Sequence, residues 1–395
     1  MNVNRMKRAI YSILLLSGLS FAWIMARTLE ASPQWKGRIE TENGVKVVKN
    51  PAAPLFGEFA FDFEEDLAIG GDPTKENAYF PRGGVLSVDD EGNLFIADFG
   101  NVRVQMFDKT GAFVRQLGRK GQGPGEYSFP SKVLFDPEGN PCVWAARDII
   151  CFGKDGYFKK KIPVNARLSI LSSGPKGTII GTIQVERGPD GPKYTLIQLD
   201  LEGAQLRTIA EYRGDFKKNQ ARIIFHAYTN RIVFESLIAD SFVYGFTEDY
   251  RLYVADSEGR TTLVIACEEK PISITGKEKA ETQKTGIHAW MGTSDKTLND
   301  NDFPDHRPYF GRIFTDDADR IYVARTGSIL EKDAPARIDV FSKDGYFLYK
   351  MSWRTFPAVI RAGCFYQVRE DKETNEYQIV RFRIKNWGRM KKGRE

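Results

Sequence analysis

Short stretches of alternating apolar and polar residues recur along this chain, and turns that contain glycine separate them. Alternation with a period of two is typical of a β-strand that buries one of its faces. The first clear unit spans about 81–118, and four such stretches follow one another in it, at 84–88, 93–98, 103–107 and 113–117. The pattern therefore predicts four short strands joined by tight turns.

This four-strand unit is repeated along the chain. The phrase Lys-Thr-Gly-Ala-Phe at 109–113 returns as Lys-Asp-Gly-Tyr-Phe at 154–158 and again at 343–347. Further units are predicted at about 129–165, 168–212 and 222–269, and from 308 onward. Four short strands repeated about every 40–50 residues are typical of a β-propeller.

Two irregular segments complete the predicted architecture. An insert at about 271–306 separates the fourth and fifth units, and its capping-box pattern, Thr275 followed by Glu278, predicts a short surface helix. The sixth unit shows only three strands, and we expect the segment near Phe59 to Ile69 to supply the fourth. We therefore predict an all-β fold over 58–386, a six-bladed β-propeller closed by an N-terminal strand, with one short helical insert.

The N-terminus has the pattern of an export signal. Residues 9–26 contain no charged side chain and follow Arg5, Lys7 and Arg8. We interpret residues 1–26 as a signal peptide, or alternatively as an uncleaved N-terminal anchor that tethers the protein to a membrane, and 27–57 as a polar lead-in. Either interpretation predicts an extracytoplasmic protein, periplasmic or secreted.

Charge is unevenly distributed. Residues 1–26 carry +3 and residues 381–395 carry +6, so the rest of the chain carries −4 of the total of +5. A nucleic-acid-binding domain needs a basic folded face, and this body is mildly acidic, so we expect no nucleic-acid partner. We interpret 387–395 as a solvated basic tail, with contact to an acidic membrane or partner as the alternative.

Cys142 and Cys151 flank a predicted tight turn at Ala146 and Arg147. In an antiparallel hairpin with that turn they would face each other, which allows a cross-strand disulfide. The alternative is a pair of small buried apolar residues. No Cys-x-x-Cys motif occurs, so the cysteines do not point to a zinc or thioredoxin-like site.

The first unit has one distinctive motif, in which Asp98, Asn101 and Arg103 follow the second strand. Asx side chains that bind backbone groups and an Arg that pairs with Asp account for these residue types as a structural turn. With Pro81, Gly83 and the glycine-rich link at 118–127, the unit resembles an NHL-repeat blade. Later units share only the strand order and the turn glycines. The resemblance, to secreted bacterial six-bladed propellers of NHL type, implies the fold and a binding platform but no particular reaction.

A binding surface is expected where the links enter the innermost strands. Arg82, Lys132, Tyr309 and Arg312 lie at or near these entries, and Arg147 lies in a turn on the same face. A rim with cationic and aromatic side chains suits an anionic or peptide ligand. The alternative is an ordinary solvated rim.

The sequence contains no catalytic signature. Its three histidines, His226, His288 and His306, are scattered, and no cofactor-binding or metal-binding residues can be assigned. We therefore predict a platform that binds a protein or a small ligand. The alternative is a lactonase-like or amidating-lyase-like hydrolase or lyase with a divalent cation in the propeller channel.

Overall fold

The computed structural model describes residues 34–394 except 73, 75, 165–167, 189–190, 214–225, 239, 286–297, 299 and 372–375. The chain divides into two units, residues 1–36 and 37–395, and the second holds every element named below. The predicted signal peptide or anchor lies outside the described residues. Within the described part, no helix is both long and apolar enough to span a membrane.

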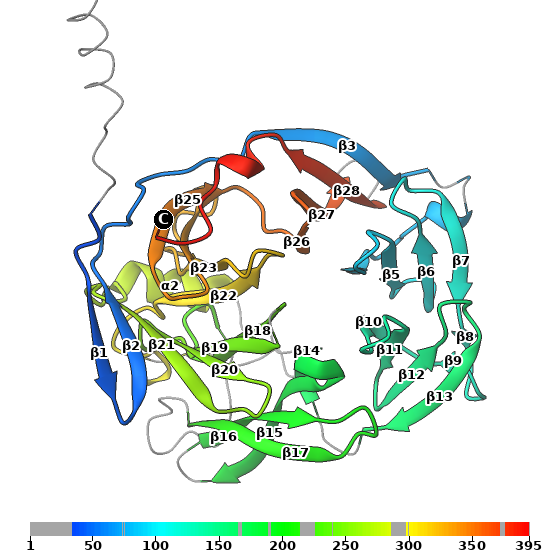
Figure 1. Cartoon of the computed structure of the whole chain (residues 1–395), viewed down its shortest axis with the longest axis horizontal. Coiled ribbons are helices and arrows are strands. Elements are labelled where there is room, and N and C mark those ends of the chain that lie inside the picture. Colours follow the sequence, from blue (N-terminus) through cyan, green and yellow to red (C-terminus); the bar gives the residue numbers. More distant parts are fainter. Residues whose placement is uncertain are drawn as a thin grey trace, which may run out of the picture. The chain divides into compact units, whose positions relative to one another are not determined.

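The second unit contains six antiparallel blades (Figure 1). Blades I and II are β4 (Gly84–Val88), β5 (Leu94–Asp98), β6 (Arg103–Phe107) and β7 (Phe113–Leu117), then β10 (Pro130–Phe135), β11 (Pro141–Ala145), β12 (Asp148–Phe152) and β13 (Phe158–Pro163). Blades III and IV are β14 (Leu168–Ser173), β15 (Ile179–Gly188), β16 (Gly191–Leu199) and β17 (Gln205–Arg213), then β18 (Ile232–Leu237), β19 (Ser241–Phe246), β20 (Arg251–Asp256) and β21 (Thr261–Cys267). Blades V and VI are β22 (Phe310–Thr315), β23 (Ile321–Arg325), β24 (Ala336–Phe341) and β25 (Phe347–Trp353), then β26 (Val359–Arg361), β27 (Cys364–Asp371), β28 (Glu376–Ile384) and β3 (Phe63–Gly70).

The blades form a closed ring. Their innermost strands contact one another in the order β4, β10, β14, β18, β22, β26 and back to β4. Blade VI is completed by β3, which pairs antiparallel with β28 through Ile69 and Ile379 (Figure 1). The predicted six-bladed fold and its closure by an N-terminal strand are both confirmed. The core lies between blades, where the apolar side chains of neighbouring sheets form separate buried clusters.

The expectation that strands begin only at about residue 58 is wrong. A hairpin of β1 (Arg38–Glu42) and β2 (Val45–Asn50) extends blade IV, because β2 pairs in parallel with β21. Val47 and Val48 are fully buried there. The next segment lies along blade V, where the Phe56 amide donates to the Leu348 carbonyl (2.9 Å). Residues 38–57 of the supposed lead-in are therefore part of the propeller unit.

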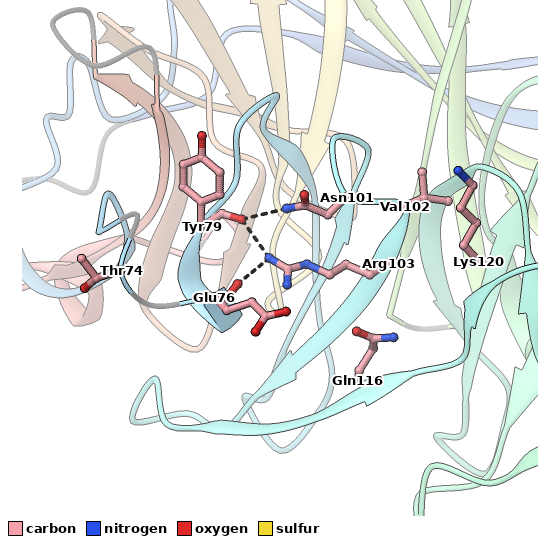
Figure 2. A pocket seen from close by; sticks show the side chains of 8 residues that line it. All are labelled: Thr74, Glu76, Tyr79, Asn101, Val102, Arg103, Gln116 and Lys120. Atoms are coloured by element: carbon pink, nitrogen blue, oxygen red, sulfur yellow. Dashed lines mark hydrogen bonds between the residues drawn. The ribbon is translucent and has the colours of Figure 1, made fainter.

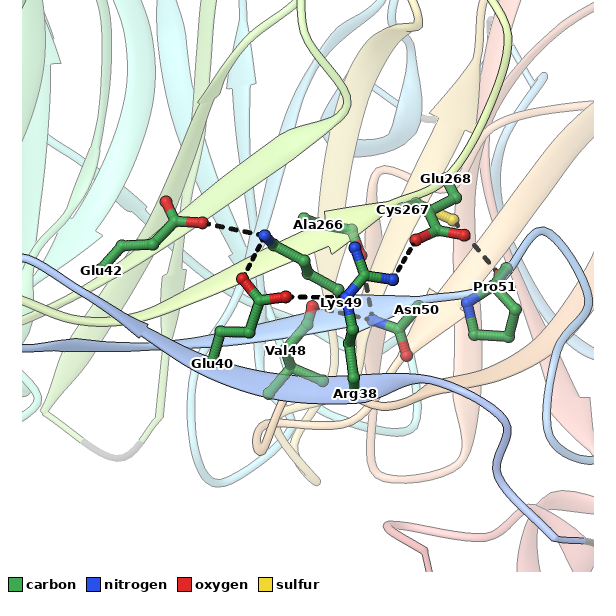
Figure 3. A network of polar contacts seen from close by, with 10 residues as sticks. All are labelled: Arg38, Glu40, Glu42, Val48, Lys49, Asn50, Pro51, Ala266, Cys267 and Glu268. Atoms are coloured by element: carbon green, nitrogen blue, oxygen red, sulfur yellow. Dashed lines mark hydrogen bonds and ion pairs between the residues drawn. The ribbon is translucent and has the colours of Figure 1, made fainter.

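Charged side chains fasten the added hairpin (Figure 3). Arg38 is 2.6 Å from Glu268, which follows β21, and Lys49 lies 3.2 Å from Glu42. Glu42 also pairs with Arg251 at the start of β20 (2.6 Å). The hairpin is thus bound to blade IV by ion pairs as well as by the parallel ladder.

The turn glycines have a common packing role. Gly203, between β16 and β17, has φ of +81°, and a Cβ there would lie 2.7 Å from the Pro163 carbonyl oxygen of the preceding blade. Gly345, between β24 and β25, likewise has positive φ and lies against Val48 and Ile265 beside blade IV. Only glycine combines this backbone conformation with such a close approach, which explains why the glycine recurs at the blade period.

The short elements lie in the links between strands. Helix α2 (Gly276–Thr285) confirms the predicted helix, and the Glu278 amide and carboxylate bond reciprocally with Thr275. It is not simply a surface helix, because Glu278 and Thr282 are buried. The remaining short elements are β8 (Arg119–Lys120), β9 (Glu126–Tyr127), η1 (Glu76–Ala78), η2 (Pro175–Gly177), η3 (Asp300–Asp302) and η4 (Trp387–Arg389).

Trp387 and Met390 of the C-terminal segment pack against the propeller, contrary to the expectation of a wholly solvated tail, whereas its basic residues Arg389, Lys391, Lys392 and Arg394 are exposed. Met390 is buried, and its carbonyl accepts a hydrogen bond from Arg320 (3.2 Å). The Arg320 guanidinium lies 4.2 Å from the centre of the Trp387 ring. Apolar contact and cation–π attraction outweigh the solvation of this basic segment.

The packing role of the turn glycines predicts a difference between two matched substitutions. Gly44 has the same φ as Gly203, +81°, but no atom lies within 4 Å of its added Cβ. We expect Gly44→Ala to lower the free energy of unfolding by about 1–2 kcal/mol through backbone strain alone. Gly203→Ala should cost about 1–3 kcal/mol more because of the clash with Pro163. Urea unfolding of both variants measures this difference, and equal losses would contradict the packing role.

Candidate functional site

The links into the innermost strands and the turns after the second strands lie on one face. Antiparallel pairing sets Phe310 at the start of β22 against Arg325 at the end of β23, and Pro130 against Ala145 in blade II. We call this the entry face. The five residues predicted to form the rim lie toward this face: Arg82 and Tyr309 precede β4 and β22, Lys132 and Arg312 are the third residues of β10 and β22, and Arg147 lies in the turn after β11.

The rim residues do not form one cluster. Arg82 and Arg147 are exposed, and the half-buried Lys132 lies 3.5 Å from the Leu171 carbonyl of blade III. Among the described contacts, no hydrogen bond, ion pair or ring contact joins these three residues to Tyr309 or Arg312. Their role in binding therefore stays a prediction.

Arg312 has a cationic neighbour that the sequence analysis did not select. Arg231, which directly precedes β18, donates from Nη2 to the Gly311 carbonyl at the start of β22 (3.0 Å). Burial, followed by the charge of Arg312, lowers the pKa of Arg231. Both side chains are nevertheless exposed to solvent. Two guanidiniums from blades IV and V therefore lie near each other on the entry face, and the space beside them is open to solvent.

No described carboxylate neutralises this pair. Within the described part of the chain, neither Arg231 nor Arg312 has an acidic side chain within 4.0 Å. The Arg312 guanidinium instead lies 4.9 Å from the centre of the Phe356 ring, and Phe356 stacks on Phe314. Such an arrangement offers charge-assisted hydrogen-bond donors that no described acidic side chain uses.

Tyr309 lies beside this space but belongs to a different contact. Its hydroxyl lies 3.4 Å from the Glu269 carbonyl, and its ring stacks on Tyr250. Tyr250 is buried and donates to Asp339 (2.5 Å), which also pairs with Arg325 (3.0 Å). Glu269, Arg325 and Asp339 also line a cavity of about 420 Å³, whose other walls are strands of blade V and the segment 58–60. Tyr309 therefore helps to close the boundary between the two blades.

A buried carboxylate joins the loops that precede the two arginines. Glu278 of α2 accepts hydrogen bonds from Tyr228 (2.5 Å) and Ser328 (2.8 Å) and pairs with Arg307 (2.8 Å). Burial acts to raise the pKa of Glu278, but the donors, together with Thr275, outweigh it and hold the pKa at about 2. Glu278 is therefore ionised at neutral pH and fixes the links before β18 and β22.

His226 has a structural position. Its Nδ1 accepts from the Tyr228 amide (3.2 Å), so Nε2 carries the proton and donates to the Asp302 carbonyl (2.9 Å). Burial lowers the pKa of His226 despite that carbonyl. His306 lies beside Tyr309, with Nδ1 3.0 Å from the Arg307 carbonyl, and His288 lies outside the described residues.

The Asp98 motif has the expected structural role, and Figure 2 shows its Asn101 and Arg103 side chains bonded to the segment before blade I. The Arg103 Nε donates to Asp98 (2.9 Å), and its Nη2 donates to the carbonyls of Glu76 and Tyr79 (both 2.8 Å). Asn101 also donates to the Tyr79 carbonyl (3.1 Å). The motif ties the segment before blade I to its second turn and forms one wall of an open cavity of about 450 Å³.

The cysteines of blade II lie in the register that the turn predicts. Cys142 pairs directly with Cys151, their Cα atoms are 4.0 Å apart, and the two sulfurs form a disulfide. Cys267 and Cys364 are free. In the described ranges, no three His, Cys, Asp or Glu side chains are grouped so that they could hold a metal ion.

Comparison with known proteins supports the fold. Residues 74–255 match the model of a family described as a 6-bladed beta-propeller. A candidate exported protein of Bacteroides fragilis aligns with 85% of this chain and 100% of its own, at 13% identity and a TM-score of 0.52. A member of the duf4221 family from Bacteroides vulgatus aligns with 82% of this chain and 98% of its own, at 12% identity and a TM-score of 0.52.

The comparisons show no activity. Virginiamycin B lyase from Staphylococcus aureus aligns with 81% of this chain and 99% of its own, at 12% identity, but its TM-score of 0.37 is too low to support an argument. No curated protein matches the sequence. The resemblance to NHL repeats therefore stays a prediction, while the six-bladed propeller is established.

The position of Glu278 predicts a large effect of removing its charge. We expect Glu278→Gln to lower the free energy of unfolding by about 3 kcal/mol, because Arg307 would lose its buried partner. Glu281→Gln on the same helix is the control, since Glu281 makes an exposed pair with Lys332 and should contribute little. Chemical denaturation compares them. Similar stability of the two variants would rule out a structural role for the buried carboxylate.

The lowered pKa of His226 predicts sensitivity to acid. The unfolded chain takes up a proton near pH 6.5, whereas the folded protein resists it to a lower pH, so stability is lost as the pH falls through this range. The free energy of unfolding falls by at most about 1.4 kcal/mol for each pH unit in this range. Unfolding free energies measured between about pH 7.5 and pH 5.5 should depend less on pH in His226→Gln than in His306→Gln. An unchanged slope in His226→Gln would show that His226 is not the responsible group.

Proposed function

We propose that this protein is an extracytoplasmic binding propeller that holds an acidic ligand on its entry face, where blades IV and V meet. The observation that carries this proposal is the convergence of Arg231 and Arg312 without an acidic partner among the described residues. Two like charges held close together repel each other, and an acidic ligand would relieve that repulsion.

The cellular location in the proposal is supported by two further observations. Residues 1–26 have the sequence pattern of a signal peptide or anchor. In addition, a structure with the same fold belongs to a candidate exported protein. The described residues offer no observation that favours the metal-dependent hydrolase or lyase.

Capture of ligands from a cell-envelope extract tests the proposal. We expect the full chain to retain a compound or peptide, and the double variant Arg231→Gln/Arg312→Gln to retain about tenfold less, because both positive charges are removed. Mass spectrometry after denaturation measures the retained material.

Arg389→Gln is the matched control for charge. Arg389 is exposed and lies beside Met390, which contacts Arg320 at the end of blade V opposite to the entry face. Retention by this variant should equal that of the original chain. If the double variant retains the ligand as well as the control does, the ligand does not bind beside the two arginines and the proposal is wrong.

A further inference from the structure

We propose that Arg231 and Arg312 together bind one tetrahedral dianion, a phosphate monoester group of the ligand. This inference rests on the proposed function and names the chemical group that the same site takes. It follows from the charge of the pair, the number of unused donors and the way in which the two side chains are held.

The charge of the pair matches a dianion. Each guanidinium carries a full positive charge at neutral pH, and no described carboxylate lies within 4.0 Å of either. A carboxylate ligand would leave one positive charge unbalanced in this space. A phosphate monoester would balance both charges, and so would inorganic sulfate, which is also a tetrahedral dianion.

The donors of the pair are largely unused. Arg231 spends one N–H group of Nη2 on the Gly311 carbonyl, and no other hydrogen bond of its guanidinium occurs among the described residues. The Arg312 guanidinium lies 4.9 Å from the centre of the Phe356 ring, and no hydrogen bond of its N–H groups occurs among the described residues. The three terminal oxygens of a phosphate monoester offer these two guanidiniums more acceptor sites than the two oxygens of a carboxylate do.

The site is fixed before a ligand arrives. The Arg231–Gly311 bond links blade IV to blade V, and a Cβ at position 311 would lie 3.3 Å from the Arg231 Nη2. Tyr228 precedes Arg231 by three residues, Arg307 precedes Arg312 by five, and both bond to the buried Glu278. One carboxylate therefore holds the two links that carry the arginines. A link that is already ordered loses less conformational entropy when a ligand binds.

The nearest acidic residue along β18 does not compete for the pair. Glu235 accepts a hydrogen bond from Ser172 (2.8 Å), so its carboxylate is turned toward blade III rather than toward Gly311 on blade V. It lies four residues deeper along the strand than Arg231. A dianion is therefore favoured beside the two arginines and opposed further in.

Calorimetric titration of the full chain with inorganic phosphate, inorganic sulfate and acetate tests the inference. We expect phosphate and sulfate to bind about tenfold more tightly than acetate, because only a dianion balances both charges. Methyl phosphate and methyl sulfate then separate the effect of charge from that of shape. Methyl phosphate carries a second negative charge at neutral pH and methyl sulfate does not, so a site for phosphate monoesters binds methyl phosphate more tightly.

Variants separate binding from folding. Arg231→Gln and Arg312→Gln should each weaken phosphate binding about tenfold, while Arg389→Gln should not change it. Gly311→Ala should weaken it by a smaller factor, because the methyl group displaces the Arg231 guanidinium without removing its charge. Thermal unfolding of each variant confirms that it is folded.

The outcomes distinguish this inference from the proposed function. Acetate binding as tightly as phosphate, or phosphate binding that survives both glutamine substitutions, would overturn the dianion site. If phosphate fails to bind but the double variant still loses the extract ligand, the binding face stands and its ligand has another chemistry. If phosphate binds as expected but the double variant retains the extract ligand, the proposed function is wrong.

Discussion

The structure depends on the hydrogen-bonded ladder between β3 and β28, because this ladder alone completes blade VI. The two strands come from opposite ends of the propeller sequence, and Ile69 lies opposite Ile379. Without β3, blade VI would expose the edge of β28, and its outer apolar face would lose contacts with blade I. The stability of the closed ring therefore depends on the pairing of β3 with β28. Because these strands are far apart in the sequence, we expect their pairing to form late in folding.

Side chains on the innermost strands reinforce the ring from within. Ser87 of blade I donates to the Val133 carbonyl of blade II (2.7 Å), and Thr315 of blade V donates to the Ser236 carbonyl of blade IV (2.7 Å). Arg361 of blade VI donates to the Val88 carbonyl of blade I (3.1 Å). The inner strands share no backbone ladder, so these bonds hold neighbouring blades at the spacing that the channel requires.

The N-terminal segment adds a second fastening on the outside. Residues 38–70 lie along blades IV, V and VI in turn, through the β2 ladder, the Phe56 amide and the β3 ladder. The three blades so covered include both blades of the candidate site. The two arginines therefore lie in the part of the ring where side-chain bonds connect the inner strands and the N-terminal segment pairs with the outer strands.

Local patterns account for the parts of the fold that the sequence predicts. The alternation at 84–88 and the glycine at position 203 reflect contacts repeated in successive blades, so their period is visible in the sequence. The β1–β2 hairpin was missed because β2 pairs with β21 across more than two hundred residues, and no repeat marks that contact. Arg231 was missed because the fourth unit was placed from about residue 222, which left this residue inside the unit rather than at its entry.

Glu278 shows most clearly where prediction from sequence ends. Its bond with Thr275 is local and follows from a three-residue spacing, so the capping box could be predicted. Its bonds with Tyr228 and Ser328 span fifty residues in opposite directions and follow from no spacing. These distant bonds are the ones that join the links into blades IV and V. The regular blades can thus be predicted from the repeat. The candidate site lies beside the insert that interrupts the repeat, and the buried Glu278 carboxylate connects this insert to the links into blades IV and V.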